Sequence, residues 1–322
     1  MKKRALIFGV CGQDGVYLAK LLRDQGYEVH GTSRDKEMAN MAGLRLMGVY
    51  DDVTVHSAAL LDFRSVLQVI GDVRPDEIYN LAGQSSVGLS FAQPVETFEG
   101  IILGTLNILE CIRFLKLPAR FYNATSGEVF GNTETPADET TPFRPRSPYG
   151  VAKSTAFWTV ANYRESYGIF ACSGILFNHE SPLRPSRFVT QKIVRGAVDI
   201  AEKRAEKLTL GNLDVSRDWG WAPDYVDAMA RMLKRDEPDD YVVATGTSST
   251  LTGFVDAVFD CLSMKSSAYV ETTPDLMRPT DIRVSVGDPA KAKAKLDWCA
   301  DTTMPKLINR LVDAELARRQ TK

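Results

Sequence analysis

Short apolar segments alternate with longer segments of helical periodicity through the first 176 residues of this 322-residue chain. The predicted strands are 4–9, 27–32, 53–58, 76–82, 120–125 and 170–176. The predicted helices are 14–26, 63–73, 99–116 and the stretch that begins at Pro148. This alternation is typical of a parallel sheet with helices on both faces. It predicts an α/β fold with a doubly wound parallel sheet of the Rossmann type.

The pattern changes after residue 175, where a loop rich in proline and arginine precedes mixed helices and short strands. We therefore expect a Rossmann-type domain over 1–175 and a smaller, mixed α/β substrate-binding domain over 176–322. The segment YVVATG, residues 241–246, is a candidate to return to the first sheet.

The charge balance of 39 basic and 41 acidic residues does not favour a nucleic-acid or membrane partner. The apolar runs are shorter than the ~20 residues of a membrane span. The first ten residues run directly into a strand and a glycine loop, with no separate signal-peptide region, so we expect a cytoplasmic protein. Neither the five cysteines nor the three histidines have paired spacing, so neither a disulfide framework nor a metal site is expected.

The first predicted strand runs into a loop in which Gly9, Gly12 and Gly15 have the spacing GxxGxxG. A tight turn without side chains lets backbone N–H groups approach a diphosphate, and the N-terminus of the following helix favours its negative charge. An ordinary glycine-rich turn is the alternative, but the strand before it and the helix after it favour dinucleotide binding. Arg34, after the second strand, favours the 2′-phosphate of NADP, whereas the adjacent Asp35 leaves NAD as a less favoured possibility.

Tyr149 and Lys153 lie four residues apart just after Pro148, a residue tolerated in the first turn of a helix, so they share one helical face. A phenol titrates near ~10 and needs a neighbouring cation to act as a base at neutral pH. Lys153 supplies that cation, although a tyrosine and a lysine at this spacing are also common as exposed neighbours. With the glycine loop upstream, the pair resembles the short-chain dehydrogenase/reductase superfamily, in its extended branch that modifies nucleotide sugars.

Ser126 and Glu128 follow the fifth predicted strand, at the edge where open α/β sheets bind ligands. Ser126 resembles the superfamily's hydroxyl that bonds the reacting sugar oxygen. Glu128 suggests more than hydride transfer, because a carboxylate in this place can move a carbon-bound proton. A solvated acid is the alternative for Glu128.

Several later motifs, among them GQSSVGLSF, NHESP, FVTQKI, RDWG and RPTD, are similar to those of GDP-mannose 4,6-dehydratases, and the resemblance extends over nearly the whole chain. The catalytic residues that it implies are Ser126, Glu128, Tyr149 and Lys153. The cofactor-binding residues that it implies are Gly9, Gly12, Gln13, Asp14, Gly15, Arg34, Leu81, Ala82, Gly83, Gln84, Lys153, His179 and Arg184. The substrate-binding residues that it implies are Ser85, Ser126, Glu128, Tyr149, Asn178, Val189, Lys192, Arg217 and Arg278.

Three departures from the family pattern are visible. Gly127 stands where the family has a second hydroxyl, and Ala59 stands where it has an acid near the adenine. The loop 33–40 lacks the arginine and serine run that reaches a neighbouring subunit's cofactor in relatives. These departures bear on fine positioning, cofactor affinity and tetramer formation.

The resemblance implies a lyase that retains NADP and acts on a GDP-linked sugar, either GDP-mannose or a GDP-manno-heptose. The expected steps are oxidation at C4, elimination of water across C5 and C6, and return of the hydride to C6, which gives a 4-keto-6-deoxy sugar. A homodimer or homotetramer is expected. The alternatives are a GDP-4-keto-6-deoxymannose reductase, a sugar-nucleotide epimerase and an NADP-binding regulatory protein without catalysis.

Overall fold

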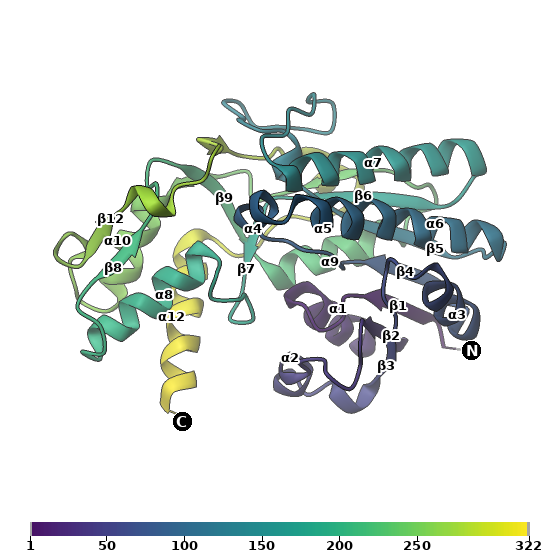
Figure 1. Cartoon of the computed structure of the whole chain (residues 1–322), viewed down its shortest axis with the longest axis horizontal. Helices are drawn as coiled ribbons and strands as arrows, with labels where there is room; N and C mark the ends of the chain where they lie inside the picture. Colours follow the sequence, from purple (N-terminus) through teal and green to yellow (C-terminus); the bar gives the residue numbers. More distant parts are fainter. Residues whose placement is uncertain (1, 321–322) are drawn as a thin grey trace.

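The computed structural model describes residues 2–320, which contain a seven-stranded, all-parallel sheet (Figure 1). Its strands are β1 (Arg4–Phe8), β2 (Glu28–Ser33), β3 (Val53–Ser57), β4 (Glu77–Asn80), β5 (Arg120–Ser126), β6 (Ala171–Leu176) and β10 (Tyr241–Val243). The order β10-β6-β5-β4-β1-β2-β3 reverses direction between β1 and β4. Such a reversal opens a crevice at the carboxyl ends of the strands. The predicted Rossmann-type fold is confirmed.

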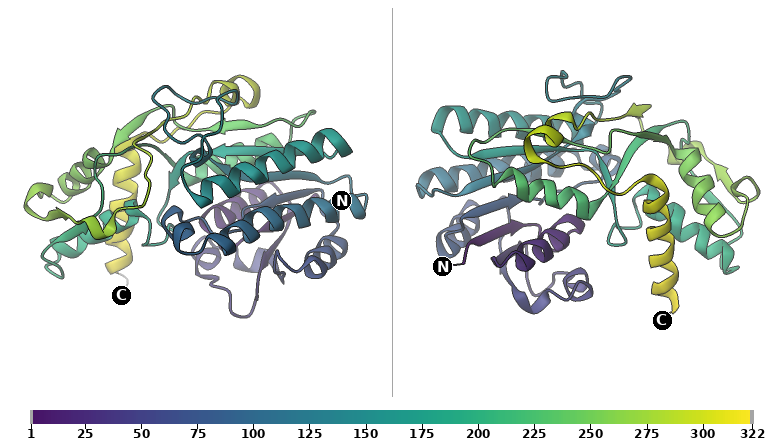
Figure 2. Two further views of the ribbon diagram at one scale, coloured as in Figure 1. Left: turned by 45° about the horizontal axis from the view of Figure 1, so that its top comes forward. Right: turned by 180° about the vertical axis from the view of Figure 1, so that it is seen from behind.

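Helices cover both faces of this sheet. One face carries α1 (Gln13–Asp24), α2 (Ala42–Leu46), α9 (Ala222–Met232) and α11 (Ala290–Leu296). The other carries α3 (Phe63–Val73), α6 (Gly104–Phe114) and α7 (Pro148–Tyr167). Figure 1 shows α6 and α7 in front, and the view from behind in Figure 2 brings α1 and α9 forward.

The alternation of buried side chains along β1 explains its continuous apolar sequence. Ala5 and Ile7 belong to the core beneath α1 and α9, whereas Leu6 and Phe8 belong to the core beneath α3 and α6. A strand that is covered on both faces has no solvent side, so it shows no polar alternation.

The predicted helix 99–116 is wrong at its start. The helical path begins with α4 (Val87–Ala92) and α5 (Pro94–Phe98), passes through the π-helical turn η2 (Glu99–Leu103) and continues as α6. Pro94 occupies the first turn of α5, where its missing N–H and fixed φ are favourable. Within residues 2–320, no helix has both the length and the apolar composition needed to cross a membrane.

A second region packs beside the carboxyl ends of the first sheet. It contains a sheet of β7 (Asn178–Glu180), β9 (Ser216–Trp221), β11 (Ser248–Thr250) and β13 (Val284–Ser285), and a pair formed by β8 (Leu208–Leu210) and β12 (Val270–Thr272). Its helices are α8 (Val189–Ala201), α10 (Leu251–Cys261) and α12 (Met304–Gln320). Short 3-10 turns are η1 (Tyr50–Asp52), η3 (Gly127–Val129), η4 (Ser266–Ala268) and η5 (Pro274–Leu276).

The chain passes between the two regions more than once. After β9 it returns to the first sheet as α9 and β10, and it does so again as α11. The candidate segment 241–246 supplies β10, which pairs with β6 at the edge of the sheet. The first region is therefore built from segments that are far apart in the sequence, since α9, β10 and α11 come from the second half of the chain.

Candidate active site

The glycine loop has backbone positions that side chains would block. Gly9 has φ +87°, and a Cβ there would lie 3.0 Å from backbone atoms of Ala82. A Cβ on Gly15 would overlap the carbonyl oxygen of Gly9 and the backbone of Val10. Gly12 is the N-cap of α1 and has no side chain to bond the first N–H groups of the helix. The loop and helix end therefore fit a diphosphate, which these N–H groups would hold.

Gln13 and Asp14, both expected on the cofactor side, turn toward the loop around β7. The Gln13 amide Nε2 donates to the carbonyl oxygen of His179 at 3.1 Å, and the Ser181 hydroxyl donates to Gln13 Oε1 at 2.8 Å. His179 Nε2 lies 2.9 Å from Asp14 Oδ2, and its ring stacks on Tyr225 with a centroid distance of 4.6 Å. The side chains expected to touch the cofactor thus join the glycine loop to the second region.

The partners of His179 define its protonation. Its Nδ1 lies 2.8 Å from the carbonyl oxygen of Phe177, which only accepts, and its Nε2 faces the carboxylate of Asp14. Both ring nitrogens must therefore carry hydrogens when Asp14 is ionised. Burial by itself lowers the pKa of His179, but the charge and hydrogen bond of Asp14 outweigh it, and the pKa lies above its usual value.

This pair predicts a pH dependence of stability. Because the pKa of His179 is raised by folding, its contribution is fully present below about pH 6.5 and is lost as pH rises through the folded-state pKa. We expect the difference in melting temperature between wild type and His179→Gln to shrink as pH increases. Thermal unfolding across pH measures it, and a constant difference would contradict the ion pair.

His56 is a control for this prediction, because its contribution to stability should change with pH in the opposite direction to that of His179. Burial, followed by the charges of His30 and Lys36, lowers its pKa. Its contribution is therefore present above the unfolded pKa and is lost as pH falls through the folded pKa. The difference in melting temperature between wild type and His56→Gln should accordingly shrink as pH decreases.

The four predicted catalytic residues come together at the carboxyl end of β5 and the start of α7. Ser126 ends β5, and its Oγ accepts the N–H of Glu128 at 3.3 Å across the η3 turn. Ser147 caps α7 by accepting the N–H of Gly150 at 3.0 Å. Tyr149 and Lys153 then project from the first turns of α7 and are only 8% and 9% exposed.

Burial dominates the electrostatics of this group. It raises the pKa of Tyr149 to about 12, against a hydrogen bond with Ser126 and the charge of Arg184. It lowers the pKa of Lys153 to about 8. The Lys153 ammonium donates to the carbonyl oxygen of Ala124 at 2.6 Å and lies 5.8 Å from the centroid of the Tyr149 ring. Lys153 therefore holds the end of β5 against α7 in this structure.

The charged groups that interact with Glu128 include Arg217 and Arg278, the two arginines expected to bind the substrate. Burial raises its pKa, Arg217 and Arg278 lower it, Asp281 raises it, and the net shift is upward. Arg217 Nη2 donates to Asp281 Oδ1 at 3.0 Å, and Arg278 Nη1 lies 3.5 Å from the same oxygen. The sequence analysis missed Asp281, although the RPTD motif that supplied Arg278 also contains it.

The remaining predicted residues line the edges of this region. Leu81, Ala82, Gly83, Gln84 and Ser85 follow β4, and the glycine loop packs on Ala82. The Gln84 amide donates to the carbonyl oxygen of Ser86 at 2.9 Å, so it shapes its own loop.

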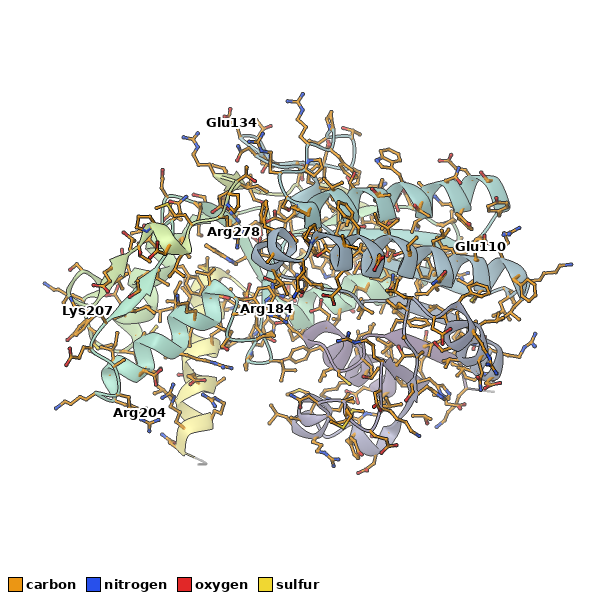
Figure 3. The ribbon with its side chains drawn as sticks, viewed as in Figure 1. Glu110, Glu134, Arg184, Arg204, Lys207 and Arg278 are labelled. Carbon is orange, nitrogen blue, oxygen red and sulfur yellow. The ribbon has the colours of Figure 1, made fainter. Side chains whose placement is uncertain are left out.

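The other predicted residues come from β2 and from the start of the second region. Arg34 is exposed at the end of β2. Asn178 begins β7, and Val189 and Lys192 lie in the first turn of α8. The Arg184 guanidinium stacks over the Phe188 ring at 3.8 Å. Figure 3 labels Arg184 and Arg278, which lie where the two regions meet in this view.

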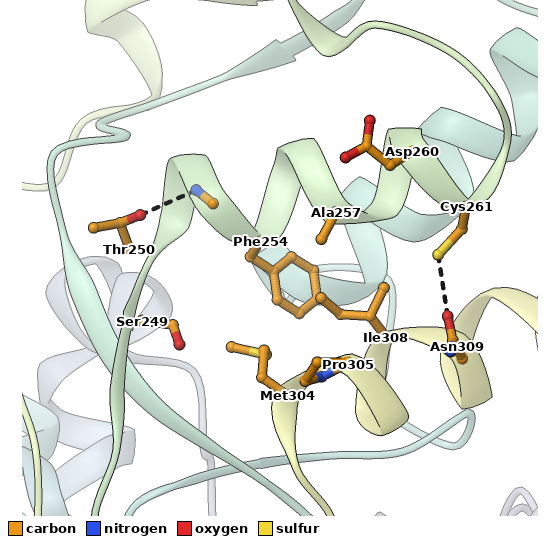
Figure 4. Close-up of a pocket in the computed structure, with 11 residues that line it drawn as sticks. Ser249, Thr250, Phe254, Ala257, Asp260, Cys261, Met304, Pro305, Ile308 and Asn309 are labelled. Carbon is orange, nitrogen blue, oxygen red and sulfur yellow. Dashed lines mark hydrogen bonds between the residues drawn. The ribbon is translucent and has the colours of Figure 1, made fainter.

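A separate cleft lies between α10 and α12 (Figure 4). Its apolar floor includes Phe254, Met304 and Ile308, and its rim includes Asp260 and Cys261. None of the predicted site residues lines it.

Solved structures with this fold define the class of protein. UDP-glucose 4-epimerase from Thermus thermophilus, complexed with NAD, superposes with a TM-score of 0.86 at 26% identity, over 97% of this chain and 99% of that one. The dTDP-glucose 4,6-dehydratase DesIV from Streptomyces venezuelae, with NAD and TYD bound, has a TM-score of 0.88 at 20% identity, over 99% and 98% of the chains. RMD from Pseudomonas aeruginosa, complexed with NADPH, has a TM-score of 0.80 at 23% identity, over 99% of both chains. The protein therefore has the extended short-chain dehydrogenase/reductase fold. These three solved structures contain NAD or NADPH.

Sequence comparison then identifies the family. The chain belongs to the GDP-mannose 4,6-dehydratase family, whose model matches residues 6–311. It is 44% identical to GDP-mannose 4,6 dehydratase 2 of Arabidopsis thaliana, over 99% of this chain and 89% of that protein. It is 41% identical to GDP-mannose 4,6-dehydratase of Vibrio cholerae serotype O1, over 99% of this chain and 95% of that protein. The resemblance inferred from the motifs is confirmed.

Proposed function

We propose that this protein is an NADP-dependent hydro-lyase that converts GDP-mannose to the GDP-4-keto-6-deoxy sugar and water. The observation that carries the proposal is Glu128, a carboxyl with a raised pKa held one turn beyond Ser126 and near Tyr149. Hydride transfer requires only the hydroxyl, tyrosine and lysine. An additional acid of this kind suits proton removal from carbon. Family membership supports the choice of GDP-mannose.

Tyr149 would take the proton of the sugar's C4 hydroxyl, with the hydroxyl of Ser126 holding the same oxygen. The chemistry that a bound NADP would supply is reversible hydride transfer, with the hydride taken from C4 and returned at C6. The pKa of the Tyr149 phenol is raised by burial, and the hydrogen bond with Ser126 and the charge of Arg184 act against this rise and favour its basic form. Lys153, whose ammonium donates to the carbonyl oxygen of Ala124 in β5, would also hold a ribose hydroxyl.

Glu128 would carry out the elimination. The 4-keto group acidifies the proton on C5, which the carboxylate of Glu128 takes up. The same proton then passes to the C6 hydroxyl, which leaves as water while the C5–C6 double bond forms. When the hydride returns to C6, C5 takes up a proton that exchanges with solvent, and the proton held by Tyr149 is released to solvent, which completes the cycle. Burial raises the pKa of the Glu128 carboxyl above its usual value, which makes its carboxylate a stronger base for the C5 proton than an exposed glutamate.

Arg34 supports NADP over NAD in this proposal. It is exposed at the end of β2, where the 2′ position of an adenosine ribose lies in this fold. We expect Arg34→Ala to weaken NADPH binding by about tenfold and to leave NADH binding nearly unchanged. Fluorescence titration of both cofactors measures this, and equal losses for the two would argue against a 2′-phosphate contact.

Proton NMR with GDP-mannose in D2O tests the function directly. A new 6-deoxy methyl signal and deuterium at C5 are expected. Reduction would instead consume stoichiometric NADPH, and epimerisation would retain the C6 hydroxyl. Unchanged GDP-mannose would contradict the proposal, and a GDP-manno-heptose is then the substrate to test.

We also propose that the protein forms a homodimer, alone or within a homotetramer, through α5, α6 and α7. These packed helices and the η2 turn that joins α5 to α6 expose large apolar side chains, including Val95, Leu103 and Trp158. We expect Leu103→Glu to shift the molecular mass measured by light scattering from a dimer or tetramer toward the monomer. Leu46→Glu, on exposed α2, is the matched control and should not change the mass.

A further inference from the structure

Asp281 lies between the two arginines of the substrate side. The oxygen that accepts from Arg217 and faces Arg278 also accepts the backbone N–H of Ile282 at 3.0 Å, which orients the carboxylate. Arg217 is buried, and its Nη1 donates to the carbonyl oxygen of Ser216 at 3.0 Å. Protein groups therefore hold this guanidinium through both of its terminal nitrogens.

The strands of the second region place Asp281 in this position. β13 pairs in parallel with β9, with Ser285 opposite Arg217, and the N–H of Ser216 donates to the carbonyl oxygen of Arg283 at 2.7 Å. Asn132, in the loop that follows Glu128, accepts the N–H of Arg283 at 2.7 Å. The segment that carries Asp281 is thus tied to the strand of Arg217 and to the loop of Glu128.

The charges in this cluster balance. Arg217 and Arg278 supply two positive charges, and Glu128 and Asp281 supply two negative charges when ionised. Tyr149 on α7 is a further titratable group that interacts with Glu128. A sugar-nucleotide diphosphate adds two negative charges, and arginines are suited to bind them through paired hydrogen bonds. Its arrival would therefore disturb a neutral, partly buried cluster.

We propose that Asp281 is a positioning residue for the elimination: it holds Arg217 and Arg278 until the diphosphate takes its place, and this exchange makes Glu128 a stronger base. The inference rests on the proposed function, because it assigns the diphosphate to these arginines. Once the arginines pair with phosphate oxygens, their charges favour the Glu128 carboxylate less. The released Asp281 carboxylate and the diphosphate disfavour it further. Nucleotide binding thereby prepares the group that removes the C5 proton.

Calorimetry with GDP tests this without turnover. Titration in buffers of different ionisation enthalpy counts the protons taken up on binding, and the wild type is expected to gain a fraction of one proton per GDP through Glu128, so that part of the Glu128 population stays ionised and can act as the base. The terminal phosphate of GDP titrates in every variant, so the difference from Glu128→Gln isolates Glu128. Asp281→Asn should reduce the uptake, because one negative charge is missing. Asp281→Glu should restore it.

Asp275→Asn, an exposed acid in the same segment, is the control and should match the wild type. Equal proton uptake by wild type and Glu128→Gln would overturn the proposal, and so would wild-type uptake in Asp281→Asn or a wild type that does not bind GDP.

The pH profile of dehydration provides a second readout. We expect Asp281→Asn to move the acid limb of kcat down by about half to one pH unit, because Glu128 loses a neighbouring negative charge. If Asp281→Asn changes KM but leaves the acid limb of the kcat profile at the wild-type pH, Asp281 is only a structural partner of the arginines, and the proposal is overturned. Absence of dehydration in the wild type would refute the proposed function, whereas the calorimetric result would still decide the role of Asp281.

Discussion

Replacing Tyr149 with phenylalanine is expected to slow dehydration by about 10²–10⁴-fold, the range typical of losing a general acid or base. The substitution removes the hydroxyl that would take the C4 proton and leaves the buried ring in place. The rate of 4-keto product formation measures the effect. Cofactor affinity and melting temperature should change little, which separates loss of chemistry from loss of structure.

Tyr163→Phe is the matched control for Tyr149→Phe. Tyr163 lies on the same helix, and its hydroxyl donates to Glu110 Oε1 at 2.5 Å. Its loss should cost about 1 kcal/mol of stability and leave the rate of dehydration unchanged. A loss below tenfold in Tyr149→Phe would remove Tyr149 from its role as proton acceptor.

Glu128→Gln is expected to abolish elimination, with a loss of about 10²–10⁴-fold or more, while the first oxidation proceeds. The amide has nearly the same shape but cannot accept the C5 proton. In a single turnover, reduced nicotinamide should therefore accumulate, and neither a methyl signal nor deuterium at C5 should appear in the NMR spectrum. NADP binding should be spared, because Glu128 lies on the side of Arg217 and Arg278.

Glu134→Gln serves as the control for this variant, since Glu134 is exposed in the loop that follows Glu128 (Figure 3). It should retain the wild-type rate. An unaltered dehydration rate in Glu128→Gln would exclude Glu128 from the mechanism.

The strands of the first sheet and the start of α7 could be predicted because their signals are local. β1 is an apolar run, β4 and β5 have apolar residues at their centres, and all three strands are buried on both faces. Ser147 and Pro148 are a cap and a first-turn residue for α7. β10 was harder to predict, because Tyr241–Val243 contains too few residues to show a period. The irregular start of the helical path before α6 had no clear signal either.

The residues of the candidate site also divide into those that local sequence patterns predict and those that only the folded structure brings together. Tyr149 and Lys153 could be paired from their spacing on one helix, and Ser126 and Glu128 from their position after a strand. The link of Asp14 to His179 joins residues 165 positions apart, and no local pattern predicts it. The RPTD motif drew attention to Arg278, but only the pairing of β13 with β9 shows that Asp281 joins Arg217 to Arg278.

The amino-acid sequence by itself determined the Rossmann-type sheet, the glycine loop and the family, because these depend on apolar periodicity and on residues close together in the chain. Only the tertiary structure decided how the charges are arranged. It placed Asp281 among the arginines near Glu128, turned Asp14 toward His179, and set the pKa directions of Tyr149, Lys153 and Glu128. Burial and Coulomb interactions depend on distances in space, and distant segments acquire those distances only when the chain is folded.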